Sequence, residues 1–336
     1  MPRNDTVPYI APAWLKSGHL QTIIPATMLS KPAVLYRRER WICPDQDFID
    51  LDFVDGAANA PLLVLFHGLE GSSDSHYARA LMSAVQQRGW SGVVVHFRGC
   101  SGQLNQAPRF YHSGDSAEIN WILRRLYQNL TDNLTDKLLF VCGVSLGGNA
   151  LLRWLGEQQT QANFIRAACA ISAPLDLSQG GSALGRGLNR LYTKVFLRTL
   201  KPKCLKKLSQ FPGLFHREHM LAANNLYEFD NIVTAPLHGY RNTTDYWDRA
   251  SAKHVLNDIT LPTLILNAKN DPFLPSQHLP NHAAACVTLD YPDHGGHVGF
   301  ASGNWPASND WLPARILHFF DQQLPTQATP LRQHHG

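Results

Sequence analysis

The sequence predicts an α/β protein with a mostly parallel central sheet, flanked by helices and carrying a helical cap insertion. Short apolar runs alternate with segments of helical periodicity along most of the 336 residues. Most of these runs are continuously apolar, which is typical of central strands that are covered on both faces. The alternation stops once, over about 180–255, and then resumes. We therefore expect one domain over 1–336 with a single helical insertion.

Seven apolar runs are predicted as strands, and three segments between the early runs are predicted as helices. The strands are Phe48–Val54, Leu62–Phe66, Gly92–Phe97, Lys137–Cys142, Ala167–Ser172, Thr263–Asn267 and Cys286–Asp290. The helices are His76–Gln87, Asp115–Asn129 and Asn149–Glu157. Because a strand–helix–strand connection within one sheet is nearly always right-handed, this order predicts parallel strands joined by right-handed crossovers.

The insertion is predicted to be a helical cap rather than a loop. The regular pattern breaks after Asp176, and the next convincing strand begins only at Thr263. A connection of that length without structure of its own would be unusual in a compact domain. The polar tail over 325–336 is expected to be loose.

Composition excludes several classes of protein. The net charge of +4 is too small to indicate nucleic-acid binding by itself, and no apolar run is long enough to span a bilayer. The first residues, Met1–Asp5, lack the apolar stretch of a signal peptide. Six cysteines are scattered without metal-type or paired spacing, and Cys142, Cys169 and Cys286 fall in predicted buried strands. We expect a reduced, cytoplasmic protein with no transmembrane segment.

A candidate nucleophile lies in the turn between a predicted strand and a predicted helix. Residues 143–147 read Gly-Val-Ser-Leu-Gly and directly follow the apolar run 138–142. This pattern is typical of a sharp strand–turn–helix elbow, which strains the backbone of the central serine and exposes its hydroxyl. The glycines leave room for the helix and the strand to pass closely. Ser145 is therefore the predicted nucleophile.

A serine hydroxyl needs a base to take its proton, and the base needs an acid to orient it. In the chain order serine, acid, histidine, Asp271 follows the sixth predicted strand and His297 follows the seventh. Two alternatives stay open, because His294 competes as the base and Asp176 competes as the acid. We favour His297 because its flanking glycines would let the loop approach the elbow. We favour Asp271 because Asp176 lies where the cap begins.

Two backbone N–H groups are expected to form an oxyanion hole. One belongs to Leu146, which follows the nucleophile at a helix N-terminus. The other is expected from the loop His67–Ser72, where the N–H of Leu69 is the natural donor. His67 precedes the serine in the chain and is expected to be structural, with its ring bonded to the loop backbone.

These residues together resemble the YheT-like branch of the α/β-hydrolases (the AB-hydrolase family 4 type), and the resemblance covers nearly the whole chain. The motifs that carry it are Gly18–Thr22, His67–Ser72, Phe97–Gly102, Gly143–Asn149 and Gly295–Phe300. The resemblance implies an α/β-hydrolase fold and a hydrolase of carboxylic esters, with Ser145, Asp271 and His297 as the catalytic triad. Relatives act on medium-chain acyl esters, monoacylglycerols or phospholipids, and some transfer acyl groups to alcohols.

Other features bear on the alternatives. Some relatives carry a His-x4-Asp acyltransferase motif, but none of the sixteen histidines has an aspartate five positions on. The spacing of His216 and His219 matches no zinc-enzyme motif, so no metal is predicted. The resemblance assigns no role to Gly18–Thr22 or to Arg98–Gly102, although Arg98 is expected to pin a loop by pairing with a carboxylate.

Basic residues gather in the predicted cap. They are Arg186, Arg190, Lys194, Arg198, Lys201, Lys203, Lys206 and Lys207. The first four recur every four residues and therefore share one helix face, and no acidic residue lies between Asp176 and Glu218. Two interpretations stay open: a solvated helix face, or a face for phosphate-bearing lipids, acyl-CoA or an anionic membrane surface.

The predicted function is therefore hydrolysis of short- to medium-chain or lipid-like acyl esters through an acyl-enzyme. The expected partner is a small-molecule acyl ester, with possible peripheral contact between the cap and anionic lipid, no nucleic acid and no cofactor. Two alternatives are an acyltransferase that uses an alcohol or thiol, and a non-catalytic binding protein on a hydrolase scaffold.

Overall fold

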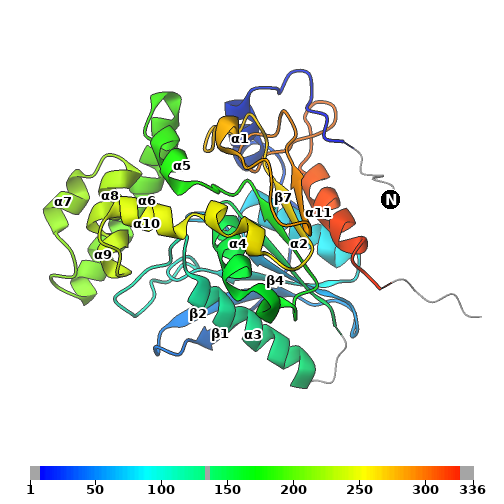
Figure 1. Cartoon of the computed structure of the whole chain (residues 1–336), viewed down its shortest axis with the longest axis horizontal. Coiled ribbons are helices and arrows are strands. Elements are labelled where there is room, and N and C mark those ends of the chain that lie inside the picture. The colour runs from blue at the N-terminus through cyan, green and yellow to red at the C-terminus, as the bar shows by residue number, and fades with distance from the viewer. Residues whose placement is uncertain (1–7, 133–136, 326–336) are drawn as a thin grey trace, which may run out of the picture.

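An eight-stranded sheet runs through the centre of the protein, in the order β1-β2-β4-β3-β5-β6-β7-β8 (Figure 1). The computed structural model describes residues 8–132 and 137–325, so the predicted loose tail lies outside the described residues from 326 onward. The strands are β1 Arg37–Ile42, β2 Phe48–Val54, β3 Leu62–Phe66, β4 Ser91–His96, β5 Leu139–Val144, β6 Ala167–Ile171, β7 Thr263–Leu266 and β8 Val287–Asp290. Every predicted strand is present, with ends within about two residues of those expected.

The prediction of a mostly parallel sheet is confirmed. Strands β3 to β8 are parallel to their neighbours among themselves, whereas β2 is antiparallel to both β1 and β4. The edge strand β1 was not predicted, because its sequence is charged rather than apolar. Arg38 and Arg40 of β1 form paired hydrogen bonds with Asp52 and Asp50 of β2. Cys286 lies just outside β8 and is half-buried, so its predicted burial in a strand is wrong.

Helices cover both faces of the sheet. They are α1 Gly18–Thr27, α2 His76–Gln87, α3 Ser116–Asp132, α4 Leu146–Gln158, α5 Leu177–Leu184, α6 Arg190–Gln210, α7 Arg217–Ala222, α8 Leu226–Ile232, α9 Thr234–Leu237, α10 Thr243–Ala250 and α11 Trp311–Asp321. One apolar cluster joins α3 and α4 to one face of the sheet, and a second joins α2 and α11 to the other face. The three predicted helices correspond to α2, α3 and α4, while α1 and α11 were not predicted.

Helices α5 to α10 occupy the chain between β6 and β7, where the cap is expected over about 180–255. They gather at one end of the molecule, away from α11 (Figure 1). The first of them begins at Leu177, directly after β6, and the last ends at Ala250. They have an apolar cluster of their own, which includes Leu197, Phe215 and Phe229. The cap helices are therefore packed against one another as well as against the sheet domain.

Helix α1 packs against the loop that contains His297, and glycines make this contact possible. A Cβ on Gly299 would lie 1.7 Å from the carbonyl oxygen of Gln21, and one on Gly296 would lie 2.6 Å from that of Gly18. The glycines around His297 therefore make room for α1. From the sequence we expect them to let this loop approach the elbow at Ser145, so the expected contact differs from the observed one.

We predict that Gly299→Ala destabilises the protein by about 1–3 kcal/mol, because the added methyl group overlaps a backbone atom of α1. The measurement is the free energy of unfolding in urea. Gly185→Ala is the matched control, because a Cβ there meets its nearest atom at an ordinary 3.5 Å. Equal stability of the two variants would contradict the packing of α1 on this loop.

His67 joins the loop after β3 to the end of β4. Its Nδ1–H donates to the carbonyl oxygen of Gly68 at 2.7 Å, and its Nε2 accepts from the backbone N–H of Phe97 at 3.1 Å. The expected bonding of this ring to loop backbone is confirmed. Burial lowers the pKa of His67 to about 3, so the ring stays neutral in the folded protein.

The low pKa of His67 predicts acid sensitivity. Below pH 6.5 the imidazole of His67 binds a proton in the unfolded chain but stays neutral in the folded protein. The free energy of unfolding therefore falls as the pH falls. His67→Asn has no imidazole at this position, so its stability does not fall in this way with pH. The native protein should be more stable than the variant at pH 7, and this difference in the free energy of unfolding should be about 2 kcal/mol smaller at pH 5. Unfolding free energies at both pH values test this, with exposed His282→Asn as the control. A deficit that stays constant would contradict a neutral buried ring.

Candidate active site

Ser145 occupies the sharp turn between β5 and α4. Its backbone has φ 52° and ψ −119°, a conformation that side chains other than glycine rarely adopt. The turn is crowded, because a Cβ on Gly147 would lie 2.5 Å from the carbonyl oxygen of His67. The predicted strained elbow is therefore confirmed. Leu146 begins α4 directly after it, so its N–H has no partner within the helix.

The structure brings Ser145, His297 and Asp271 together. Nε2 of His297 lies 2.9 Å from Oγ of Ser145, and its Nδ1 lies 2.9 Å from Oδ2 of Asp271. Asp271 is 4% exposed and also accepts a hydrogen bond from the backbone N–H of Phe273 at 2.7 Å. A carboxylate at Nδ1 favours the tautomer with its proton there, which leaves Nε2 free to accept the serine proton.

The two alternative residues have other partners. Nδ1 of His294 lies 3.3 Å from Nδ2 of Asn270. Asp176 caps the N-terminus of α5 and pairs with Nζ of Lys253 at 2.7 Å. Within 8–132 and 137–325, neither residue hydrogen-bonds to Ser145. The geometry thus favours His297 and Asp271, the two residues that are preferred on the sequence.

The ring of His297 is positioned by residues that the sequence left without a role. Oγ1 of Thr22, in α1, accepts from the backbone N–H of His297 at 2.9 Å. The ring of Phe273 stacks on the imidazole with centroids 3.9 Å apart. Ser172 Oγ accepts from the N–H of Val298 at 3.0 Å, where the backbone again has a positive φ, 59°. The Gly18–Thr22 motif was the only sequence signal for any of these contacts.

The loop after β3 lies against the elbow and is held by two tyrosines. A Cβ on Gly68 would lie 3.1 Å from that of Ser145. The N–H of Gly68 donates to Oη of Tyr77 at 2.9 Å, and the N–H of Glu70 donates to Oη of Tyr111 at 2.7 Å. Leu69 is therefore fixed between two tethered residues beside the serine, where the sequence analysis placed an oxyanion donor.

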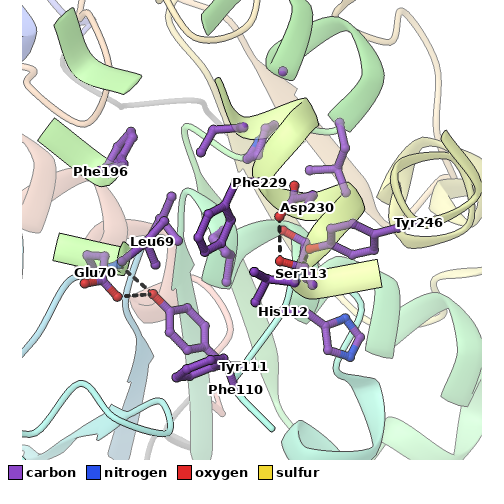
Figure 2. A pocket seen from close by; sticks show the side chains of 18 of the residues that line it. Leu69, Glu70, Phe110, Tyr111, His112, Ser113, Phe196, Phe229, Asp230 and Tyr246 are labelled. Atoms are coloured by element: carbon purple, nitrogen blue, oxygen red, sulfur yellow. Dashed lines mark hydrogen bonds between the residues drawn. The ribbon is translucent and has the colours of Figure 1, made fainter. Parts of the chain in front are cut away.

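An apolar cavity leads away from this site into the cap. It holds about 1110 Å³ of empty space including its mouth, and both Ser145 and His297 line it. Leu69 of the loop after β3 and the cap residues Phe196 and Phe229 contribute to its wall (Figure 2). An apolar cavity with a few convergent polar groups is typical of a small-molecule site.

Two polar pairs contribute to the cavity wall. Lys203, on α6, donates to Oε1 of Glu70 at 2.8 Å, and the same oxygen accepts from Oη of Tyr111 at 3.1 Å. Asp230, in α8, accepts from Trp247 Nε1 at 2.8 Å, and burial raises the pKa of Asp230 to about 6 (Figure 2). Lys203 and the Asp230–Trp247 pair belong to cap helices, whereas Glu70 belongs to the loop after β3, so the cap provides charged as well as apolar wall.

Arg98 is buried and pairs with carboxylates from two parts of the chain. Its guanidinium donates to Asp45 at 2.7 Å and Asp47 at 2.8 Å, and also to Glu118 of α3. The expected pinning of a loop by Arg98 is confirmed. Arg98 also lines the cavity, whereas its three carboxylate partners do not.

No group of three or more His, Cys, Asp or Glu side chains is placed to hold a metal ion in 8–132 or 137–325. No helix in the same part of the chain is long and apolar enough to cross a membrane.

Known proteins resemble the chain over most of its length. The alpha/beta hydrolase fold family matches residues 61–303. YheT of Escherichia coli (strain K12), which carries the provisional name of an esterase, is 38% identical over 97% of this chain and 96% of its own length. A Homo sapiens protein named phospholipase ABHD3 is 28% identical over 95% of this chain and 80% of its own.

A solved structure also shares the fold. An esterase of Pyrococcus furiosus superposes with a TM-score of 0.54 at 17% identity, covering 87% of this chain and 99% of that one. This likeness concerns the fold alone, whereas the sequence matches extend through the elbow and both flanking loops. The chain therefore belongs to the α/β-hydrolase family, in its YheT-like branch.

Proposed function

We propose that this ester hydrolase cleaves short- to medium-chain or lipid-like acyl esters through a covalent acyl-serine. The observation that carries the proposal is the continuous contact from Asp271 through His297 to Ser145, at the wall of an apolar cavity. The names of the relatives, an esterase and a phospholipase, support an ester as the substrate.

Each residue has a distinct role in the proposed reaction. His297 takes the proton of Ser145, whose oxygen forms a bond to the ester carbonyl carbon. Asp271 stabilises the imidazolium that results, and it does not itself take the proton. His297 then gives its proton to the departing alcohol as the carbon–oxygen bond breaks. In the second half, His297 takes a proton from a water molecule, whose oxygen forms a bond to the acyl carbon. The bond from that carbon to Oγ of Ser145 then breaks, His297 returns the proton to Oγ, and the acid leaves.

The negative oxygen of each tetrahedral intermediate is proposed to lie between the N–H groups of Leu69 and Leu146. Donors that are already oriented stabilise this charge without reorganisation during the reaction. The helix N-terminus at Leu146 adds a favourable partial charge. The two tyrosine tethers on the loop around Leu69 support the same assignment, because they fix its backbone.

The acyl chain is proposed to lie in the cavity between sheet and cap. Its wall residues Phe196, Leu200 and Phe229 offer apolar surface but no free charge to an acyl chain. Contact between the cap and anionic lipid is proposed as well. A cytoplasmic location stays a proposal, supported by the six free thiols.

Ser145→Ala should abolish hydrolysis, with a loss of at least about 10⁴-fold in kcat, because the acyl-serine cannot form. The assay is release of p-nitrophenol from esters of acetyl to palmitoyl chain length. The chain length with the highest kcat/KM reports the depth of the cavity. Unfolding curves that match the native protein show that the fold is intact.

The alternatives give different results in the same assay. Transfer of the acyl group to an added alcohol in preference to water would favour the acyltransferase. Absence of turnover with every ester, together with a Ser145 that resists a fluorophosphonate probe, would favour the binding scaffold. Turnover that persists in Ser145→Ala would contradict the proposed nucleophile.

The ion pair between Lys203 and Glu70 connects the cap to the proposed oxyanion loop. Glu70 follows Leu69, and its own backbone has a positive φ of 56°. Its side chain is 8% exposed, so removal of Lys203 would leave a buried carboxylate without its cation. Such a carboxylate moves toward water, and the backbone of Leu69 would move with it.

We therefore predict that Lys203→Met lowers kcat about tenfold with a smaller change in KM, because the oxyanion donor is displaced. Lys203→Arg should restore most of the activity. Lys206→Met is the matched control, because Lys206 lies on the same helix and is exposed. A loss of activity that appears equally in Lys206→Met would show that the effect belongs to the helix and not to the ion pair.

A further inference from the structure

We infer that the start of α6, the preceding 3-10 turn Gly187–Asn189 and the outer side of α1 form one docking face for an anionic lipid bilayer. The inference rests on the proposed function, since it explains how a lipid-like ester would reach Ser145. The docking face comprises apolar Leu20, Ile23, Leu188, Leu191 and Val195 with basic Arg186, Arg190, Lys194 and Arg198.

The first observation is exposed apolar surface on the cap. Leu188, Leu191 and Val195 are 66%, 60% and 54% exposed, although each would gain free energy from burial. Leu191 and Val195 are four positions apart and share one side of α6, and Leu188 lies in the 3-10 turn that directly precedes this helix. Single exposed apolar residues are common, but a row of them indicates a surface that meets another apolar phase.

The second observation is that α1 continues this apolar row. Leu20 and Ile23 are 45% and 43% exposed and lie three positions apart on α1. Oη of Tyr192, on α6, lies 3.1 Å from Nδ1 of His19, so the two helices are in contact. Leu20 and Ile23 therefore add exposed apolar surface on a helix that is in contact with α6.

The third observation places this surface beside the active site. The ring of Tyr192 packs on Phe273 with centroids 4.9 Å apart, and Phe273 stacks on His297. Phe196 lines the cavity, whereas its neighbour Val195 is exposed. One stretch of α6 thus has an inner side in the cavity wall and an outer side in the docking face. A chain leaving the bilayer here would have a short path to the serine.

The fourth observation is charge. The basic residues of the docking face are exposed, and no ion pair joins any of them to a carboxylate in the part of the chain that the structure describes. A helix with adjoining basic and apolar surfaces is typical of peripheral binding to anionic membranes. In an anionic bilayer, the lipid head groups would attract the basic side chains and the acyl chains would contact the apolar side chains.

The experiment measures binding of the full chain to vesicles by co-sedimentation. The vesicles contain phosphatidylcholine alone or an equal mixture with phosphatidylglycerol. The native protein should bind the mixed vesicles and bind them less as salt rises, because screening weakens the charge attraction. The triple variant Arg190→Gln, Lys194→Gln and Arg198→Gln should lower the partition coefficient about 100-fold. Leu191→Asn with Val195→Asn should lower it at least about tenfold.

Matched controls separate the docking face from general charge and polarity. Lys31→Gln, Arg241→Gln and Lys269→Gln remove the same charge from exposed positions elsewhere, and Leu35→Asn with Ile42→Asn remove exposed apolar groups elsewhere. These controls should bind as the native protein does. All variants should hydrolyse a soluble p-nitrophenyl ester at the native rate, because none of the substitutions touches the site.

The possible outcomes are distinct. Selective loss of binding in the docking-face variants supports the inference. Failure of the native protein to bind mixed vesicles, or equal binding by docking-face variants and controls, overturns it. If the protein binds vesicles but hydrolyses no ester, the docking face is supported and the proposed function is contradicted. If it hydrolyses esters but binds no vesicles, the proposed function is supported and the docking face is contradicted.

Discussion

The positive φ of Ser145 is the constraint on which the rest of the site depends. A turn this sharp requires that α4 begin at once after β5, and it requires glycine where α4 passes the loop after β3. The same crowding presses that loop against the serine, which brings its backbone within reach of the reaction. Strain at one residue thus determines where the proposed nucleophile, the N-terminus of α4 and the proposed oxyanion loop lie relative to one another.

The histidine is positioned in a different way, through contacts from distant parts of the chain. Thr22 binds its backbone, Phe273 covers its ring, and Ser172 holds the strained residue that follows it. Each contact comes from a separate element, namely α1, the loop after β7 and the end of β6. The imidazole is therefore held in one orientation, and this orientation is suited to proton transfer with Ser145.

The sequence predicted what local pattern can encode. Continuous apolar runs identified the central strands, and the elbow motif with the chain order of acid and base identified three residues that the structure brings together. Helix α1 was not predicted because Pro25 interrupts a weak pattern. Strand β1 was not predicted because it is rich in charge, and two of its arginines pair with aspartates on the neighbouring strand β2. The contacts of Thr22 and Lys203 join residues more than a hundred positions apart, and no local pattern reports such distances. The glycines near His297 are evident in the sequence, but they contact α1, which lies far away in the chain.

The two sides of the sheet end differently, and this bears on how the protein behaves at high concentration. On one side the last strand is β1, which carries three arginines and one glutamate, and two of the arginines are bound to aspartates of β2. On the other side β8 is only four residues long. An exposed strand edge invites strands from neighbouring molecules, and charge or brevity discourages them. A sheet that ends in these two strands offers little template for growth into aggregates, even though its interior strands are almost wholly apolar.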